Sequence, residues 1–184
     1  MSEAPPITLE RLSVADDETL GFLLASYREL FGSRVEATAV PRDLQRFADH
    51  YGAGRGCLLL ARDVAGEPLG SIAYRPYDRR FPQLAYPGER VVEVVRLFVV
   101  PRQRRQGLAR RLFAALLVQA RRDAVERLYL HTHPFLPGAE AFWLGQGFQV
   151  VARETALPWQ TLHLDRRLDN LRRPPGPDRA DRCP

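Results

Sequence analysis

Apolar residues follow strand-like spacing in some segments of this chain and helical spacing in others. Residues 7–12 alternate as a half-buried strand does, and the acidic run at 16–18 is a helix-start signal. Apolar positions at helical spacing continue to residue 31, and a second helix is predicted over residues 41–50. Three glycines within residues 52–56 end this part.

The middle of the chain has the pattern of three strands in a meander. Residues 57–61 form a short apolar run, a turn is expected at 65–68, and residues 69–74 form the return strand. Residues 75–89 are rich in Pro, Arg and Tyr and predict an exposed loop. Residues 90–100 predict the longest strand, and its apolar interior on both faces places it at the centre of the sheet.

The last part alternates between helices and strands. A helix is predicted over 109–122, a strand over 127–131, a helix over 138–144, and strands over 148–152 and 161–164. This element order predicts an α/β fold, a single domain with a central mixed, mostly antiparallel sheet flanked by helices.

The two ends of the chain differ in composition from the rest. Residues 1–6 are expected to form a flexible arm. Residues 169–184 are dominated by Pro, Arg and Asp and lack apolar periodicity, so we expect a disordered tail. Residues 7–168 are then the folded domain.

The composition narrows the classes of function and of location. All 27 basic residues are Arg, so the chain has no lysine that could form a Schiff base. No apolar run approaches the roughly 20 residues of a membrane span, and the first residues do not resemble a secretory signal. Cys57 and Cys183 lie in no metal-binding or redox spacing, so a reduced, cytoplasmic setting is expected.

Positive charge is concentrated where the strand over 90–100 runs into the next helix. Five arginines surround the predicted helix start: Arg102, Arg104, Arg105, Arg110 and Arg111. A helix N-terminus already carries about half a positive charge and unbonded N–H groups, so each cation held there costs on the order of 0.3–1 kcal/mol. The segment therefore predicts a bound anion, most simply a phosphate-bearing ligand.

Four segments resemble the GNAT acetyltransferase superfamily. Residues 104–109, Arg-Arg-Gln-Gly-Leu-Ala, match its pattern Arg/Gln-x-x-Gly-x-Gly/Ala. Residues 93–101 resemble its central strand, 128–132 its next strand, and 141–148 its later helix with the Gly-Phe that follows. In element order the resemblance covers roughly residues 7–168.

The resemblance implies acetyl-coenzyme A (acetyl-CoA) as the acyl donor and no metal. It places the pyrophosphate on residues 104–109 and the pantetheine arm on the backbone of Phe98 and Val99. The candidate cofactor-binding residues are Leu97, Phe98, Val99, Arg104, Arg105, Gln106, Gly107, Leu108, Ala109 and Arg110. Position 105 departs from the family, where it is often Gly.

The resemblance also implies that Glu93 is the catalytic general base, often acting through water. Burial in an apolar strand would raise its pKa toward neutrality, which suits a base. Strict alternation places it on one face with four apolar residues, Val91, Val95, Leu97 and Val99. The alternative is an ion pair with Arg90 or with another arginine near the start of the strand.

The general acid is not apparent from the sequence. Where the family commonly has a Tyr to protonate the leaving thiolate, this chain has Trp143, whose indole cannot act as an acid. Tyr74 and Tyr129 are the fallbacks. His131 and His133 form a His-x-His pair that lacks an evident third metal ligand; His131 is equally open to a role as auxiliary base, as a substrate contact or as a structural histidine.

These observations predict an N-acetyltransferase that moves an acetyl group from acetyl-CoA to a primary amine of a small molecule by direct attack. Five residues fall where the family often holds its acceptor: Tyr27, Arg34, Tyr74, Tyr77 and Trp159. Two alternatives stay open, a module that senses acyl-CoA without turnover and a nucleic-acid binder. We expect neither a nucleic-acid nor a membrane partner, and a homodimer stays open.

Overall fold

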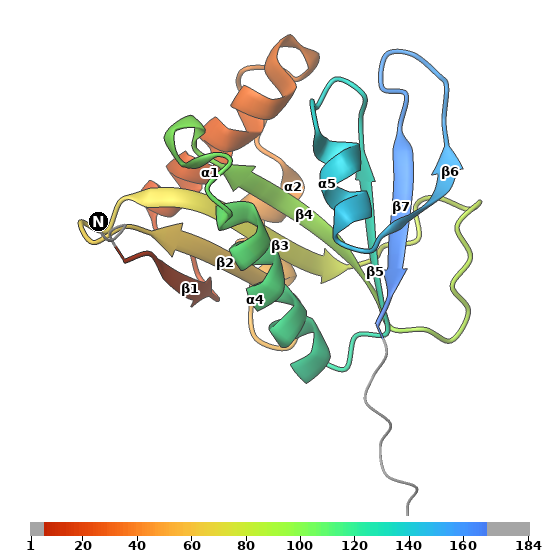
Figure 1. The fold of residues 1–184 in the computed structure, drawn as a ribbon, viewed down its shortest axis with the longest axis horizontal. Coiled ribbons are helices and arrows are strands. Elements are labelled where there is room, and N and C mark those ends of the chain that lie inside the picture. The colour runs from red at the N-terminus through yellow and green to blue at the C-terminus, as the bar shows by residue number, and fades with distance from the viewer. Residues whose placement is uncertain (1–5, 169–184) are drawn as a thin grey trace, which may run out of the picture.

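The computed structural model describes residues 6–168, and these build one seven-stranded mixed sheet flanked by helices (Figure 1). The strand order is β1-β2-β3-β4-β5-β7-β6, and only β4 and β5 pair in parallel. The predicted α/β class and mixed, mostly antiparallel sheet are confirmed. The expected N-terminal arm, apart from Pro6, and the expected tail over 169–184 lie outside the described residues.

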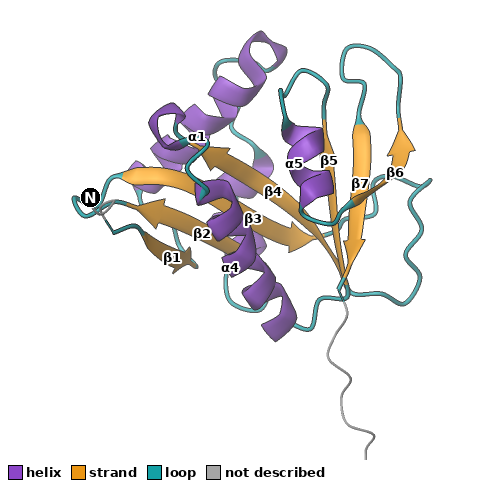
Figure 2. Ribbon diagram, in the orientation of Figure 1, coloured by secondary structure: helices purple, strands orange, loops and turns teal. Residues whose placement is uncertain are grey.

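Helices and strands have the following bounds (Figure 2). The strands are β1 (Thr8–Leu12), β2 (Cys57–Arg62), β3 (Pro68–Pro76), β4 (Val91–Val99), β5 (Arg127–Thr132), β6 (Gln149–Arg153) and β7 (Leu162–Arg167). The helices are α1 (Asp17–Phe31), α2 (Arg42–Gln45), α3 (Phe47–Tyr51), α4 (Leu108–Arg122) and α5 (Ala139–Gly145), with 3-10 turns η1 (Gly32–Arg34) and η2 (Pro101–Gln103).

The element order follows the apolar pattern closely, with one helix as the exception. The predicted start of α1 is confirmed, because the Asp16 side chain accepts a hydrogen bond of 2.8 Å from the Thr19 N–H. The single helix expected over 41–50 is wrong. It is two short helices, α2 and α3, separated by Arg46, whose φ of −120° and ψ of 52° are not helical.

The helices form two layers, one on each face of the sheet. On one face, α4 and α5 bury Leu112, Leu116 and Trp143 against the strands. On the other face, α1, α2 and α3 contribute Leu23, Leu44 and Tyr51 to a second apolar cluster. Figure 1 shows α4 crossing the strands on the near side and α1 on the far side. No helix among the described residues is long and apolar enough to cross a bilayer.

A β-bulge in β4 changes which residues share a face. Arg96 has a φ of 60°, and the register with β3 shifts so that two β4 residues lie opposite one. Val95 pairs with Ala73 and Phe98 with Ser71, so the alternation reverses beyond the bulge. The expectation that Leu97 and Val99 share the face of Glu93 is therefore wrong.

The sheet opens between its two central strands. β4 pairs with β5 only at its start, and the last pair is Glu93 with Tyr129. Beyond that point β4 stays bonded to β3 as far as Val99, while β5 stays bonded to β7 as far as Thr132. Figure 1 shows β4 and β5 diverging from this point, so each presents backbone groups toward the gap without a partner strand.

The loop between β3 and β4 is more than the exposed connection that its composition predicts. Leu84 is buried, and the Phe81 ring packs 4.6 Å from the His163 ring and 5.9 Å from that of His131. The loop therefore covers one face of β5 and β7 and brings the neighbouring Arg80 over β4.

The close approach of β3, β4 and α4 requires a glycine. A Cβ at Gly70 would lie 2.7 Å from the Phe98 carbonyl oxygen and 3.3 Å from the Leu112 side chain. We expect Gly70→Ala to lower the free energy of unfolding by about 1–3 kcal/mol, measured by urea denaturation. The matched control is Gly21→Ala in α1, where a Cβ meets nothing within 4 Å and should stabilise by about 0.5–1 kcal/mol. Equal effects at both positions would contradict this account.

Candidate active site

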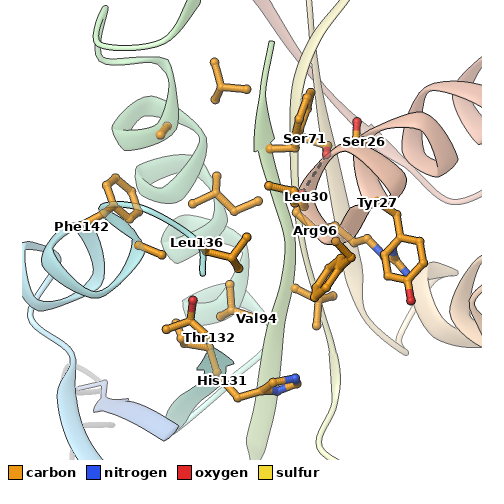
Figure 3. A pocket seen from close by; sticks show the side chains of 18 of the residues that line it. Ser26, Tyr27, Leu30, Ser71, Val94, Arg96, His131, Thr132, Leu136 and Phe142 are labelled. Atoms are coloured by element: carbon orange, nitrogen blue, oxygen red, sulfur yellow. Dashed lines mark hydrogen bonds between the residues drawn. The ribbon is translucent and has the colours of Figure 1, made fainter. Parts of the chain in front are cut away.

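A cavity of about 630 Å³ fills the gap between the diverging strands. Its walls come from the open half of β4, the end of β5, the last turns of α1 and the start of α5. Figure 3 shows Leu30 of α1 on one side and Thr132 and Leu136 on the other, with the His131 side chain reaching from β5 toward β4. A volume of this order suits a small molecule or part of a cofactor.

The turn before α4 gathers backbone N–H groups that have no acceptor. α4 begins after Gly107, which has a φ of 83°, and no acidic residue lies in its first turn. Within residues 6–168, no hydrogen-bond acceptor is found for the N–H groups of residues 105–110. Such a concave run of N–H groups at a helix start is a site for an anion such as a phosphate.

The departure from the family pattern in this turn has a backbone cost. Arg105 has a φ of 62°, in the left-handed region where a glycine is unstrained and another residue loses about 1–2 kcal/mol. This left-handed backbone conformation explains why glycine is common at this position. The Arg105 guanidinium could offset the backbone cost by donating charge-assisted hydrogen bonds to a bound anion.

The predicted cofactor-binding residues divide between the cavity and the turn. Leu97, Phe98, Val99, Arg104 and Ala109 line the cavity. The others, Arg105, Gln106, Gly107, Leu108 and Arg110, form the turn and the first residues of α4. Arg104 connects the two parts, because its Nε donates to the Val99 carbonyl at 2.9 Å and its guanidinium pairs with Glu29 at 2.6 Å.

Glu93 lies at the point where the strands part, and it is fully buried. Its carboxylate contacts Arg75 at 3.0 Å and forms a two-point pair with Arg80, and its Oε1 lies 3.1 Å from the His131 Nδ1. Glu93 is therefore paired with arginines, as the alternative interpretation held, but these come from β3 and the β3–β4 loop, and the expectation of Arg90 is wrong. Arg90 instead donates its backbone N–H to Glu126 at 2.7 Å.

The expected direction of the Glu93 pKa is also wrong. Burial alone raises the pKa, but the hydrogen bonds from His131 and Arg80 and the charge of Arg75 outweigh it and hold the pKa well below its usual range. Glu93 is therefore an ionised carboxylate at every pH near neutrality.

A second buried carboxylate continues the charged cluster. Asp43 of α2 accepts from Arg96 at 2.9 Å and 2.5 Å and from the Tyr51 hydroxyl, and Arg75 approaches it at 3.7 Å. Burial raises the pKa of Asp43, but the hydrogen bonds from Arg96 and Tyr51 outweigh this effect and hold the pKa below its ordinary value. Arg75 thus links the two carboxylates into one network beneath the cavity.

The sequence did not identify four members of this network, Asp43, Arg75, Arg80 and Arg96. Asp43 and Arg80 come from segments whose patterns predict only a helix and an exposed loop. The one signal available was within β4, where Glu93 and Arg96 interrupt an otherwise apolar strand.

The aromatic residues considered as acids or acceptor contacts lie in different places. Trp143 lines the cavity and packs in the apolar core 5.6 Å from Phe113. Tyr74 donates to Asp123, and Tyr129 lies 2.8 Å from a ring nitrogen of His163, and neither lines the cavity. Burial raises the pKa of both tyrosines, which makes them weaker acids.

Of the five acceptor-side candidates, Tyr27 lines the cavity directly. Trp159 instead joins an aromatic cluster with Phe31, His133 and Phe135, at ring distances of 4.9–6.2 Å, and Arg34 stacks on Phe135 at 4.0 Å. Phe31 is the member that also lines the cavity. Across residues 6–168, no three His, Cys, Asp or Glu side chains lie close enough to hold a metal ion.

The Glu93 network predicts a pH-dependent stability difference. Glu93→Gln keeps the shape but leaves Arg75 and Arg80 without their buried partner, so at pH 7 the free energy of unfolding should fall by about 2–4 kcal/mol. The pKa of Glu93 is lower in the folded protein than its ordinary value of 4.5 in the unfolded chain. The ionised carboxylate therefore stabilises the folded state fully at pH values above 4.5, and this contribution shrinks as the pH falls from 4.5 toward the pKa in the folded protein. At pH 3.5 the gap between wild type and variant should therefore be smaller by about 1.4 kcal/mol.

Urea denaturation at the two pH values measures this gap. The control is Glu67→Gln in the turn between β2 and β3, where the side chain is exposed and no ion pair is found among the described residues. It should be near neutral at both pH values. A Glu93→Gln gap that does not change with pH would contradict the ionised assignment.

Comparison with known proteins identifies the family and the fold. A family model described as the acetyltransferase (GNAT) family matches residues 20–148. No curated protein matches the chain by sequence. An acetyltransferase from Streptococcus agalactiae is 17% identical, with a TM-score of 0.68 over 88% of this chain and 98% of that chain.

Two further solved structures share the fold. An acetyltransferase of the GNAT family from Staphylococcus aureus is 15% identical, with a TM-score of 0.68 over 89% of this chain and 100% of that one. The Salmonella typhimurium protein yncA, solved with its cofactor acetyl-CoA, is 18% identical, with a TM-score of 0.67 over 89% and 95%. Because the family model spans more than half of the sequence, this chain belongs to the acetyltransferase (GNAT) family.

Proposed function

We propose that the protein is an N-acetyltransferase that moves the acetyl group of acetyl-CoA to a primary amine of a small molecule. The observation that carries the proposal is the continuity between the opened β4–β5 gap and the turn before α4. A cavity with unpartnered strand backbone leads there to a run of unbonded N–H groups. The two features suit the two chemically different parts of one donor molecule.

The donor fits these features by complementary chemistry. The pyrophosphate of coenzyme A would be held by the N–H groups of residues 105–110, with Gly107 keeping the approach open and the nearby arginines adding charge. The amides of the pantetheine arm would bond to the exposed edge of β4 at Leu97, Phe98 and Val99, as an added strand does. The Val99 carbonyl already accepts from Arg104, so the arm and Arg104 share this edge.

The acceptor would enter the part of the cavity lined by α1 and α2. This wall combines Tyr27, Ser26 and Arg42 with the paired Asp43 and Arg96. The cavity volume of about 630 Å³ is shared with the pantetheine arm, which favours a small acceptor. Arginine on this wall favours an amine that also carries an anionic group, such as an amino acid.

Proton removal is where Glu93 enters the proposed reaction. The acceptor nitrogen bonds to the acetyl carbon, the carbon–sulfur bond breaks, and the nitrogen loses a proton. We retain Glu93 as the carboxylate on which this proton loss depends. Glu93 is ionised and buried and does not line the cavity, so it would influence the acceptor through a residue that does.

The second candidate function is a module that binds acyl-CoA without turnover. The observation that favours it is Trp143 lining the cavity where the family commonly has a tyrosine acid. It predicts the same donor binding as the enzyme, so only turnover separates the two.

Donor binding is tested by thermal denaturation. At 100 times its Kd, acetyl-CoA should stabilise the protein by about 2.7 kcal/mol, which raises the Tm by roughly 5–10 °C. S-acetylpantetheine lacks the pyrophosphate and should raise it far less. Released thiol is then measured across a panel of amines, amino acids and antibiotics. Binding with no release favours the sensor, and no Tm shift at millimolar acetyl-CoA contradicts both.

The turn before α4 is tested by two matched glycine variants. Gly107 and Gly66 both have left-handed φ, 83° and 88°, and a Cβ at either meets nothing within 4 Å. Gly107→Ala and Gly66→Ala should each lose about 1–2 kcal/mol of stability from the same backbone strain. Only Gly107→Ala should weaken acetyl-CoA binding, by tenfold or more in Kd measured by calorimetry. Equal affinities in the two variants would contradict the assignment of the turn.

A further inference from the structure

His131 lies between Glu93 and the cavity. The Glu93 carboxylate is fully buried behind the cavity wall, and its Oε1 lies 3.1 Å from the His131 Nδ1. His131 is two residues beyond the last β4–β5 pair, lines the cavity and has 27% of its side chain exposed. A group in the cavity therefore meets the imidazole and not the carboxylate.

The carboxylate fixes which ring nitrogen carries the proton. An ionised carboxylate only accepts hydrogen bonds, so its 3.1 Å contact favours the tautomer of neutral His131 that carries the proton on Nδ1. Arg80 Nη2 also lies within hydrogen-bond distance of Nδ1, at 3.4 Å, and because a guanidinium only donates, this longer contact would need the opposite tautomer. We take the shorter contact with the charged carboxylate as the deciding one. The lone pair then belongs to Nε2, for which no partner is found within residues 6–168.

We propose that His131 is the catalytic residue that takes the proton from the acceptor amine and that Glu93 is a positioning residue acting through it. The inference rests on the proposed acetyl transfer. As the nitrogen–carbon bond forms, the N–H proton passes to Nε2, and the imidazolium is paired with Glu93. The carbon–sulfur bond breaks, and the thiolate takes the same proton directly or through water, so charge and protons balance. The relay also supplies the acid that Trp143 cannot.

Charged and titratable groups from several elements surround His131. The charged and titratable groups that face it are Glu93 from β4, Arg80 from the β3–β4 loop, His133 and Tyr129 of its own segment, and His163 from β7. Burial lowers the pKa of His133 and His163 and raises that of Tyr129. Glu93 and Arg80 keep their charge near neutrality.

The kinetic test uses the best acceptor of the amine panel. His131→Ala should lower kcat by about 100- to 1,000-fold, leave the Kd for acetyl-CoA within about twofold, and recover partly with added imidazole. The control His50→Ala, outside the cavity lining, should change kcat by less than about twofold. Normal turnover by His131→Ala would overturn the relay while leaving acetyl transfer intact.

The second measurement does not require an acceptor. In ¹⁵N-labelled protein, neutral His131 should carry its proton on Nδ1, and Glu93→Gln should weaken this tautomer preference because the charged acceptor that faces Nδ1 is lost. A proton on Nε2 in the wild type, or a tautomer ratio unchanged in Glu93→Gln, would overturn the relay. If Glu93→Gln does not fold, the wild-type tautomer alone decides. Failure of the proposed function appears separately, as no acetyl-CoA binding in the wild type.

Discussion

The separation of β4 from β5 is the constraint on which the remainder of the site depends. Backbone groups in a sheet need partners, and here the ladder stops after Glu93 and Tyr129 although both strands continue. Beyond that point β4 remains hydrogen-bonded to β3 and β5 to β7, so both strands stay in the sheet although they separate from each other. The result is a cavity whose walls are strand edges, with the helix start of α4 next to it.

The charged cluster at the base of this opening follows from the same geometry. A carboxylate where strands part would be expensive if left unpaired. Arg75 reaches Glu93 from β3, and Arg80 reaches it from the loop. Because guanidinium groups do not lose their proton near neutrality, they fix the carboxylate in one charge state. His131 is the neighbour of Glu93 that also lines the cavity.

Local patterning predicted most of the fold and singled out the turn before α4. Strands, α1, α4 and α5 follow from periodicity and capping, and the turn at 104–109 from its charge and its single Gly107. The cluster around Glu93 depends on residues 13 to 53 positions apart in sequence, so periodicity could not bring them together. Strict alternation along β4 would place Glu93 and Arg96 on opposite faces of the sheet and bury one of the two charges beneath α4. The bulge at Arg96 instead turns both side chains toward α1 and α2. Two charged residues at an odd spacing in an apolar strand are therefore a sequence sign of such a bulge.

The aromatic cluster of Phe31, His133, Phe135 and Trp159 lies away from the last β4–β5 pair and bridges the two halves of the sheet. Within residues 6–168, no backbone hydrogen bond between β4 and β5 is found beyond Glu93, so the two halves of the sheet are joined by main chain at one end only. Contacts between rings are weaker and less directional than a hydrogen-bonded ladder. The spacing of the two cavity walls at that end therefore depends on side-chain packing, and replacing one of these loop rings would be expected to change it.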